Sequence, residues 1–211
     1  RRLNAIVKYI LSIFIGPCLV AGSLLQADII INEISARGSE RLLRWDDNNQ
    51  PFVGSSPVWR AAEFNDSLWK VGNTPIGYDL GTINTNLGSI LRGISPSLYV
   101  RKDFNVPANK ASSSRPLILR INYNDGFIAW VNGIEVARAN TGADKAHIYF
   151  DQLAYRGSSI GTSTTDFILG SASALLSPGE NTLAIQIANQ DPAGNLRLDM
   201  SLLIDESNAT D

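Results

Sequence analysis

The chain has 211 residues, of which 44% are hydrophobic and 18% are charged, and this balance excludes a disordered polar chain. Its 18 basic and 20 acidic residues give a net charge of −2, so we expect no nucleic-acid partner, because such binding usually requires a basic excess. A single cysteine and a single histidine exclude a disulfide scaffold and a multi-histidine metal site within one chain.

Residues 1–27 have the pattern of a secretory signal peptide. The basic residues Arg1, Arg2 and Lys8 precede the apolar run of residues 9–22. This run is short for a membrane span and is interrupted by a Gly-Pro pair. Cleavage after Ala27 and cleavage near Gly22 both fit the residues. We therefore expect a secreted or cell-envelope protein with no membrane span after the signal has been removed.

The first half of the remaining chain is expected to hold few regular elements. Residues 28–41 form a lead-in whose apolar run at 29–34 predicts a strand. Residues 46–57 and 72–97 are rich in Asn, Gly, Ser and Pro and predict long loops. A short turn is expected between them, near residues 60–69.

Alternating apolar and polar residues dominate the second half. The alternation predicts strands over residues 98–106, 117–123, 182–188 and 196–204, each with one buried face and one wetter face. Residues 139–163 predict another long loop. Many short strands joined by long loops are typical of an all-β chain, and we expect an antiparallel β-sandwich of the jelly-roll type.

Two turn signals stand close together in this half. Asp125-Gly126 and Asn132-Gly133 are residue pairs that supply the positive φ angles of tight hairpin turns. They separate three apolar runs. The spacing therefore predicts a three-stranded meander over residues 117–138.

Four short blocks follow one another through the chain. They read W-x-x-x-x-F-x-D-S-x-W at residues 59–69, Y-x-R-K-x-F at 99–104, N-D-G followed by N-G within 124–136, and L-x-x-G-x-N-x-L-A within 176–185. In this order the blocks resemble those of galactose-binding-like jelly rolls, which include the N-terminal sugar-binding domain of family 2 glycoside hydrolases. The resemblance covers about residues 42–205.

The resemblance implies a galactose-binding-like sandwich over residues 42–205, with residues 206–211 as the start of a linker. Similar modules occur in large exported bacterial proteins, and catalysis in the family 2 enzymes belongs to a separate barrel domain. The resemblance therefore implies a non-catalytic carbohydrate-binding or accessory module of a larger extracellular protein. Its expected partners are a carbohydrate and the neighbouring domains of the same polypeptide.

Three aromatic residues are the candidate sugar contacts. Trp130 is out of phase with its apolar neighbours in residues 127–131, so it occupies the other face of the sheet, either as an exposed platform or under a loop. Tyr78 and Tyr155 fall in the expected long loops, where binding residues are often presented. An aromatic wall with a few polar groups is typical of small-ligand sites.

A calcium site is the candidate for a cofactor. Some related sugar binders use an Asp-Asp-Gly turn for Ca²⁺ and sugar together, and this chain has Asn124-Asp125-Gly126 at the matching position. Carboxylate and amide oxygens are suitable Ca²⁺ ligands. The resemblance therefore implies Asp125 and Asn124 as metal ligands of a structural Ca²⁺.

Two other functions stay open at this point. A purely structural interdomain or cell-surface scaffold module would have the same fold without a small ligand. A hydrolase would use Ser159, because residues 157–161 formally fit G-x-S-x-G. That motif requires a following helix and a histidine downstream, whereas His147 lies upstream and no helical pattern follows. We therefore expect no catalysis by this chain.

Overall fold

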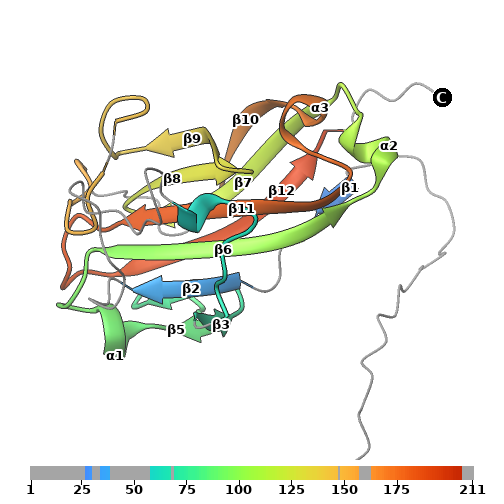
Figure 1. Cartoon of the computed structure of the whole chain (residues 1–211). Helices are drawn as coiled ribbons and strands as arrows, with labels where there is room; N and C mark the ends of the chain where they lie inside the picture. The colour runs from blue at the N-terminus through green and yellow to red at the C-terminus, as the bar shows by residue number, and fades with distance from the viewer. Residues whose placement is uncertain are drawn as a thin grey trace, which may run out of the picture.

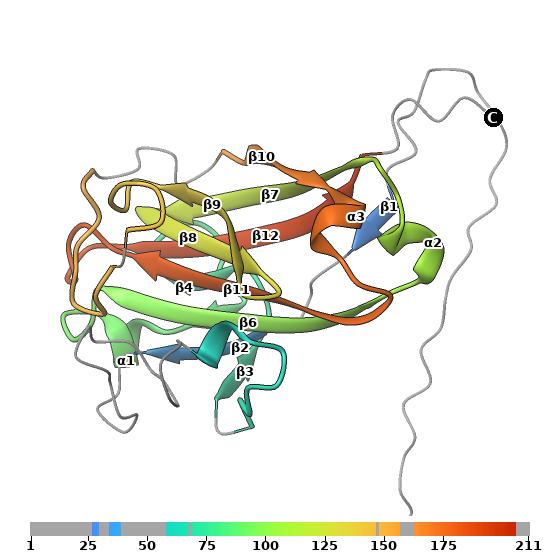
Figure 2. The same cartoon turned by 45° about the horizontal axis from the view of Figure 1, so that its top comes forward.

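A computed structural model describes residues 27–29, 34–38, 58–67, 69–146, 148–156 and 163–205 of the protein. In this part of the chain two sheets pack face to face as a β-sandwich, with a few short helices at its ends and edges (Figures 1 and 2). The fold class predicted from the sequence, an all-β antiparallel sandwich, is confirmed.

The first sheet, which we call the β12 sheet, has the order β10-β7-β12-β4-β5, and β1 also pairs with β12. Its pairs are antiparallel except for β4 and β5, which run parallel. Its strands are β1 (Ala27–Ile29), β4 (Ile76–Tyr78), β5 (Thr85–Asn86), β7 (Pro116–Asn124), β10 (Thr165–Ser171) and β12 (Leu196–Ile204).

The second sheet, the β11 sheet, has the order β3-β2-β6-β11-β8-β9 and is antiparallel throughout. Its strands are β2 (Ile34–Gly38), β3 (Lys70–Gly72), β6 (Ser97–Val106), β8 (Gly126–Val131), β9 (Ile134–Ala139) and β11 (Gly179–Ala188). The long strands β6 and β11 pair along their whole length and form the centre of the layer (Figure 1).

The helices are each one turn long. They are η1 (Val58–Arg60), α1 (Gly88–Leu91), α2 (Ala108–Ala111) and α3 (Ala172–Leu175). Among the described residues no helix is long and apolar enough to cross a membrane.

The main core lies between the two sheets and is built from every second residue of each long strand. β12 contributes Leu196, Leu198, Met200, Leu202 and Ile204, all buried, as the alternation in the sequence predicts. β7, β8 and β11 contribute their alternate residues to the same layer. Burial of these apolar faces is the dominant stabilising contribution to the sandwich.

The predicted meander is wrong at its first turn. β7 belongs to the β12 sheet and β8 to the β11 sheet, so Asp125-Gly126 carries the chain from one layer to the other. Gly126 has no positive φ; instead, a Cβ there would meet Thr141 Cγ2 at 2.8 Å and the Ala139 carbonyl oxygen at 3.0 Å. The glycine is therefore needed for a close approach of two segments, and not for a hairpin turn.

The second predicted turn is confirmed. β8 and β9 form an antiparallel hairpin around Asn132-Gly133, whose φ angles are 50° and 79°. The Asn132 side chain donates to the Leu175 carbonyl and accepts from the Thr182 backbone N–H. The turn is thereby tied to β11 and to the α3 end of the sandwich.

The predicted long strands agree with β6, β7, β11 and β12, but the loop predicted over residues 72–97 is wrong in part. That segment contains β4, β5 and α1. These elements have two to four residues each, too few for a periodic pattern to emerge. β10 was also not predicted. The strand expected at 29–34 overlaps the ends of β1 and β2, and the residues between them lie outside the described part.

Candidate ligand-binding site

The outer face of the β11 sheet carries a second apolar cluster. Trp130 and Ile128 of β8 point to this face, opposite to the core residues of the same strand. Segments from two distant parts of the chain cover the cluster, whose buried members are Trp59, Trp69, Tyr99, Ile128, Trp130, Ile148, Ala154, Ala184 and Ala188. The expectation of one wetter face is therefore wrong for β11, which is buried on both faces over residues 181–188. β8, for which a covered outer face was one of the two alternatives, is also buried on both faces.

The first cover is the segment around η1, which lies across the sheet (Figures 1 and 2). The Trp59 ring lies edge-on to Tyr99 and Trp130, with ring centroids 5.0 and 5.3 Å apart. Phe64 and Trp69 pack edge to face at 5.6 Å. Edge-to-face rings at such distances are favourable arrangements of buried aromatic side chains.

A fully buried arginine fixes this cover to the sheet. The Arg101 guanidinium donates to the carbonyl oxygens of Trp59 and Ala61, the latter at 2.8 Å, and Nε donates to Asp66 Oδ2 at 3.2 Å. It also lies 5.3 Å from the Phe64 ring centre. Two of the sequence blocks, at 59–69 and 99–104, are thus joined by one side chain. We call this arrangement the Arg101 clamp.

The second cover is the loop that follows β9, drawn in gold at the end of the sandwich in Figure 1. Ile148 and Ala154 belong to the outer cluster. The Ala154 and Tyr155 backbone N–H groups donate to the carbonyls of Asn189 and Asn140. The described part of this loop therefore rests on the sheet, while the side chains of Asp144, Lys145 and Asp151 are exposed.

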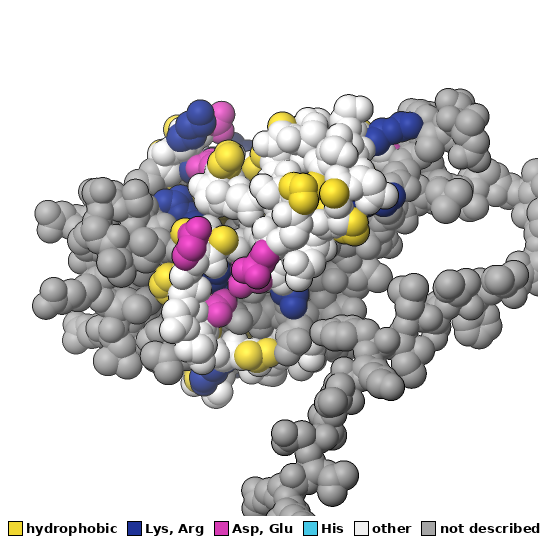
Figure 3. All heavy atoms as spheres, turned by 45° about the vertical axis from the view of Figure 1, so that its right-hand side comes forward, with side chains coloured by type: hydrophobic (Ala, Val, Ile, Leu, Met, Phe, Trp, Pro, Cys, Tyr) yellow, Lys and Arg dark blue, Asp and Glu magenta, His cyan; other side chains and the backbone are white. Residues whose placement is uncertain are grey.

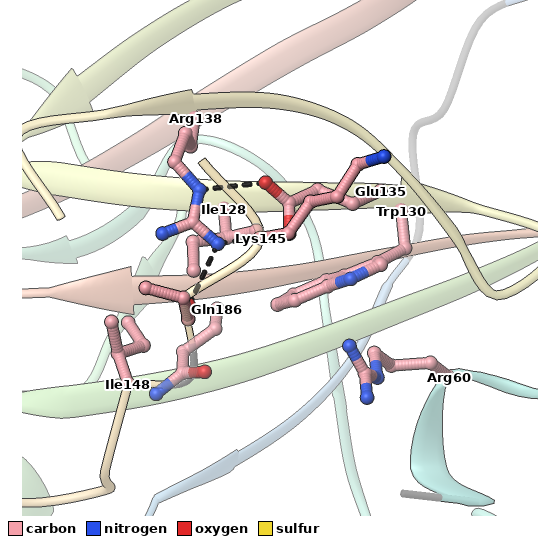
Figure 4. A pocket seen from close by; sticks show the side chains of 9 residues that line it. Arg60, Ile128, Trp130, Glu135, Arg138, Lys145, Ile148 and Gln186 are labelled. Carbon is pink, nitrogen blue, oxygen red and sulfur yellow. Dashed lines mark hydrogen bonds and ion pairs between the residues drawn. The ribbon is translucent and has the colours of Figure 1, made fainter. Parts of the chain in front are cut away.

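A pocket of about 110 Å³ lies where the two covers approach each other (Figure 4). We call it the Trp130 pocket. Its lining comes from η1, β8, β9, β11 and the loop after β9, and consists of Arg60, Ile128, Trp130, Glu135, Arg138, Lys145, Ala146, Ile148 and Gln186. Five of these nine residues are charged or polar, so the pocket is more polar than the mostly apolar sites usual for small ligands.

A β-bulge brings two charged side chains of β9 to the pocket. Glu135 and Arg138 are three residues apart, so plain alternation would place them on opposite faces. The register with β8 shifts between Ala129 and Trp130, which sets Glu135 opposite Trp130 and Arg138 opposite Ile128. The extra residue of the bulge thus directs both charged groups to the same face.

Arg138 organises the rim of the pocket. Its Nε and Nη2 donate to the two carboxylate oxygens of Glu135 at 2.6 and 2.8 Å, a bidentate pair. Further bonds from the same guanidinium reach three loop carbonyls, those of Thr141, Ala143 and Ala146. One side chain therefore holds both the carboxylate and the shape of the loop over residues 141–146.

Arg60 and Lys145 stand on opposite sides of the Trp130 ring in Figure 4. The Arg60 guanidinium carbon lies 4.6 Å from the ring centre, a cation–π arrangement. Burial lowers the pKa of Arg60, and the Glu135 carboxylate partly offsets that effect. An arginine with so high an ordinary pKa nevertheless keeps its charge at neutral pH.

The floor of the pocket includes a buried polar pair. Gln186 of β11 donates through Nε2 to the Tyr99 hydroxyl at 3.2 Å. Burial raises the pKa of Tyr99 well above its ordinary value, and Asp151 contributes in the same direction. The neutral phenol is therefore the form that the folded protein favours.

This raised pKa predicts a loss of stability at alkaline pH. Because the pKa of Tyr99 is higher in the folded than in the unfolded protein, its contribution to the unfolding free energy is complete below pH 10. The contribution is lost as pH rises from there through the folded-state pKa, at about 1.4 kcal/mol per pH unit. We expect Tyr99→Phe to cost about 1 kcal/mol at pH 8, because Gln186 loses its acceptor. Between pH 10 and 12 the unfolding free energy of this variant should fall less steeply than that of the unchanged protein.

Urea unfolding at pH 8, 10, 11 and 12 measures both effects. The Tyr155→Phe variant is the control, because Tyr155 is 65% exposed. Equal slopes for the unchanged protein and Tyr99→Phe would contradict the prediction.

The three predicted sugar contacts lie in different settings. Trp130 is on the predicted outer face but only 4% exposed, under the covers and beneath Arg60, so it is a pocket wall and not an open platform. Tyr78 was expected in a loop but is fully buried in β4, where its hydroxyl lies near Asn189 and the Pro192 carbonyl. Tyr155 is exposed in the second cover, as predicted. The structure does not bring these three residues together at one site.

The proposed calcium ligands are both buried at the crossing between the sheets. Asp125 Oδ2 accepts from the Gln190 backbone N–H at 2.9 Å, and the Asp125 carbonyl accepts from Asn140 Nδ2 at 2.9 Å. Within the described ranges no group of three His, Cys, Asp or Glu side chains is placed to hold a metal. These contacts tie three segments together and do not form a cation cage; calcium at Asn124 and Asp125 stays a prediction.

His147 and Ser159, the residues considered for a hydrolase, lie outside the described residues.

Sequence reasoning did not identify the five polar residues of the pocket, namely Arg60, Glu135, Arg138, Lys145 and Gln186. The sequence alternation could have placed Gln186 on the outer face, because this residue lies in phase with Ala184 and out of phase with the core residues of β11. No such signal exists for Glu135 and Arg138, since their common face depends on the bulge.

No protein-family model and no curated protein matches the chain. Among solved structures, it is similar to Bacteroides uniformis β-glucuronidase 2 covalently bound to cyclophellitol-6-carboxylate aziridine, with a TM-score of 0.48 and 14% identity over 86% of this chain and 18% of that one. It is also similar to Ruminococcus gnavus β-glucuronidase in complex with D-glucuronic acid, with a TM-score of 0.46 and 10% identity over 81% of this chain and 23% of that one. A third match is a β-glucuronidase from glycoside hydrolase family 2, with a TM-score of 0.46 and 15% identity over 81% of this chain and 15% of that one. The chain thus matches between 15% and 23% of the length of these enzymes.

Proposed function

We propose that the chain is a non-catalytic carbohydrate-binding module, galactose-binding-like in fold, of a larger exported protein, and that it binds sugar at the Trp130 pocket. The observation that carries the proposal is the pocket itself. It combines an indole wall with the polar ends of Glu135 and Gln186 from the sheet and of Lys145 from the loop after β9. Such a combination supports recognition of a ligand that has both hydroxyl groups and apolar C–H faces.

The polar groups of the pocket suit hydroxyl recognition. Each Glu135 oxygen accepts one bond from Arg138 and has a further lone pair for a hydroxyl donor. Lys145 is exposed and supplies donors at the rim. Tyr155, further along the same loop as Lys145, offers an exposed ring for stacking against a longer saccharide. Export of the module is supported by the pattern of residues 1–27.

Retention on glycans tests the proposal. The full chain is applied to a glycan array and to immobilised polysaccharides, with Ca²⁺ and with a chelator, and retention on at least one glycan is expected. Retention should be weakened by Lys145→Ala or Tyr155→Ala and unchanged by Lys70→Ala, since Lys70 is exposed on the edge strand β3 at the opposite end of the β11 sheet order. Absence of retention on every glycan under both conditions would refute sugar binding.

A structural module without a small ligand is the second candidate, favoured by a pair of exposed apolar side chains. Ile134 of β9 and Ile168 of β10 are 55% and 75% exposed, and these two strands are the edges of their sheets. Exposed apolar groups on sheet edges suit packing against a neighbouring domain of the same polypeptide. Glycan retention that depends on the pocket would favour the first candidate, whereas its absence would leave the second.

A further inference from the structure

The Trp130 pocket has an excess of positive charge in a chain that is acidic as a whole. Its charged lining consists of Arg60, Arg138 and Lys145 against the single carboxylate of Glu135, three cations to one anion. The chain carries a net charge of −2, and on the face shown in Figure 3 acidic and basic side chains are interspersed. The pocket is therefore a local site at which an anion would be attracted.

Two of these four charges compensate each other. Glu135 and Arg138 form the bidentate pair, and the other N–H groups of Arg138 donate to loop carbonyls. Arg60 and Lys145 then remain as the cations available to a ligand. In the part of the chain that the structure describes, neither of their charged groups makes an ion pair with a carboxylate.

The two cations come from different parts of the chain. The Arg60 guanidinium carbon lies 4.6 Å from the Trp130 ring centre. Lys145 lies in the loop that Arg138 holds, with its own backbone at a φ of 58°. Figure 4 shows the two side chains on either side of the indole. A small anion therefore contacts one of them at a time, while the positive charge of both attracts it.

The size of the pocket limits what enters it. Its volume of about 110 Å³ is well below the roughly 300 to 1,000 Å³ of pockets that enclose a drug-sized molecule. The pocket therefore encloses a part of a saccharide and not a complete one. A second hollow of about 270 Å³ shares Glu135, Arg138 and Lys145 with the pocket. It adds the carboxylate of Asp144 and reaches Phe167 and Ile168, so room for a larger body exists beside the pocket.

We propose that the Trp130 pocket attracts an anionic substituent of a glycan, a carboxylate or a sulfate, through the positive charge of Arg60 and Lys145. The proposal rests on the proposed function and adds the chemical class of its ligand. The rest of the glycan then lies outside the pocket, towards the second hollow or the exposed loop. The charge of the two cations distinguishes acidic glycans from their neutral counterparts.

The experiment compares matched glycans by calorimetry on the full chain. Carboxylated, sulfated and neutral oligosaccharides are first ranked, and the best acidic binder is then compared with its own methyl ester or desulfated form. We expect removal of the charge to weaken binding at least tenfold, and Arg60→Gln and Lys145→Gln each to weaken it about tenfold. The matched control, Lys70→Gln, should leave binding unchanged. Circular dichroism checks that Arg60→Gln is folded, and Lys145→Gln alters an exposed side chain.

The outcomes separate the two proposals. Preference for carboxylated glycans, for sulfated glycans or for both supports the inference and identifies the source of the anion. Equal binding of a glycan and its uncharged form, or binding unaffected by both variants, overturns the inference and leaves the proposed function standing. Binding of no glycan at all overturns the proposed function, and the inference falls with it.

Discussion

The Arg101→Leu variant is expected to lose about 3 to 5 kcal/mol of unfolding free energy. Arg101 is completely buried between β6 and the first cover. Its removal would leave the carbonyl oxygens of Trp59 and Ala61 without their buried donor and Asp66 without its cation. A leucine fills part of the space but satisfies none of these acceptors.

Urea unfolding at neutral pH measures this loss. Arg120→Leu is the matched control, since Arg120 forms a bidentate pair with Asp166 on the exposed surface, with N–O distances of 2.8 Å against the single 3.2 Å contact of Arg101 with Asp66. Exposed pairs contribute about 1 kcal/mol or less. The Arg101 clamp would be refuted as a stabilising element if both variants lost the same amount.

The Gly77→Ala variant is expected to lose about 3 to 5 kcal/mol by a different mechanism. Gly77 lies in β4 with a φ of 147°, and a Cβ there would stand 2.0 Å from the Leu196 carbonyl oxygen and 2.7 Å from its carbon. Both contacts are with the backbone of β12, the strand to which β4 pairs. A backbone atom cannot rotate away as a side chain can, so β4 must separate from β12.

A second glycine isolates the steric part of this effect. Gly93 has a φ of 70°, but a Cβ there would meet nothing within 4 Å. Gly93→Ala should therefore show the cost of the backbone angle alone, about 1 to 2 kcal/mol. Thermal or urea unfolding of the two variants gives the comparison. A loss in Gly77→Ala no larger than that in Gly93→Ala would show that the close approach of β4 and β12 does not constrain the fold.

The long strands were predictable from the sequence, because apolar residues recur at several alternate positions in each of them. β12 repeats an apolar residue at five alternate positions, and the predicted bounds, 196–204, are those observed. Strand pairing was less predictable. Asp125-Gly126 and Asn132-Gly133 are equivalent as sequence signals, yet one crosses between the sheets and the other closes a hairpin. The difference arises from the approach of Thr141 to Gly126, a tertiary contact.

The candidate site was predictable only in part. The phase of Trp130 within β8 correctly gave its face of the sheet. What covers that face comes from η1 and from the loop after β9, which are about 80 residues apart in the sequence. Tyr78 was expected in a loop but lies in β4. A three-residue strand in a Gly-rich segment has too few residues to show alternation, so the sequence gives no sign of it.

The aromatic contacts on the outer face have a spectroscopic consequence. Trp59 lies 6.4 Å from Trp69 and 5.3 Å from Trp130, measured between ring centres, so the Trp59 indole lies close to both of the others. We expect excitation energy to pass between indoles at these separations. The intrinsic fluorescence of the protein is therefore a built-in reporter of how η1 is seated on the sheet, and it requires no added dye.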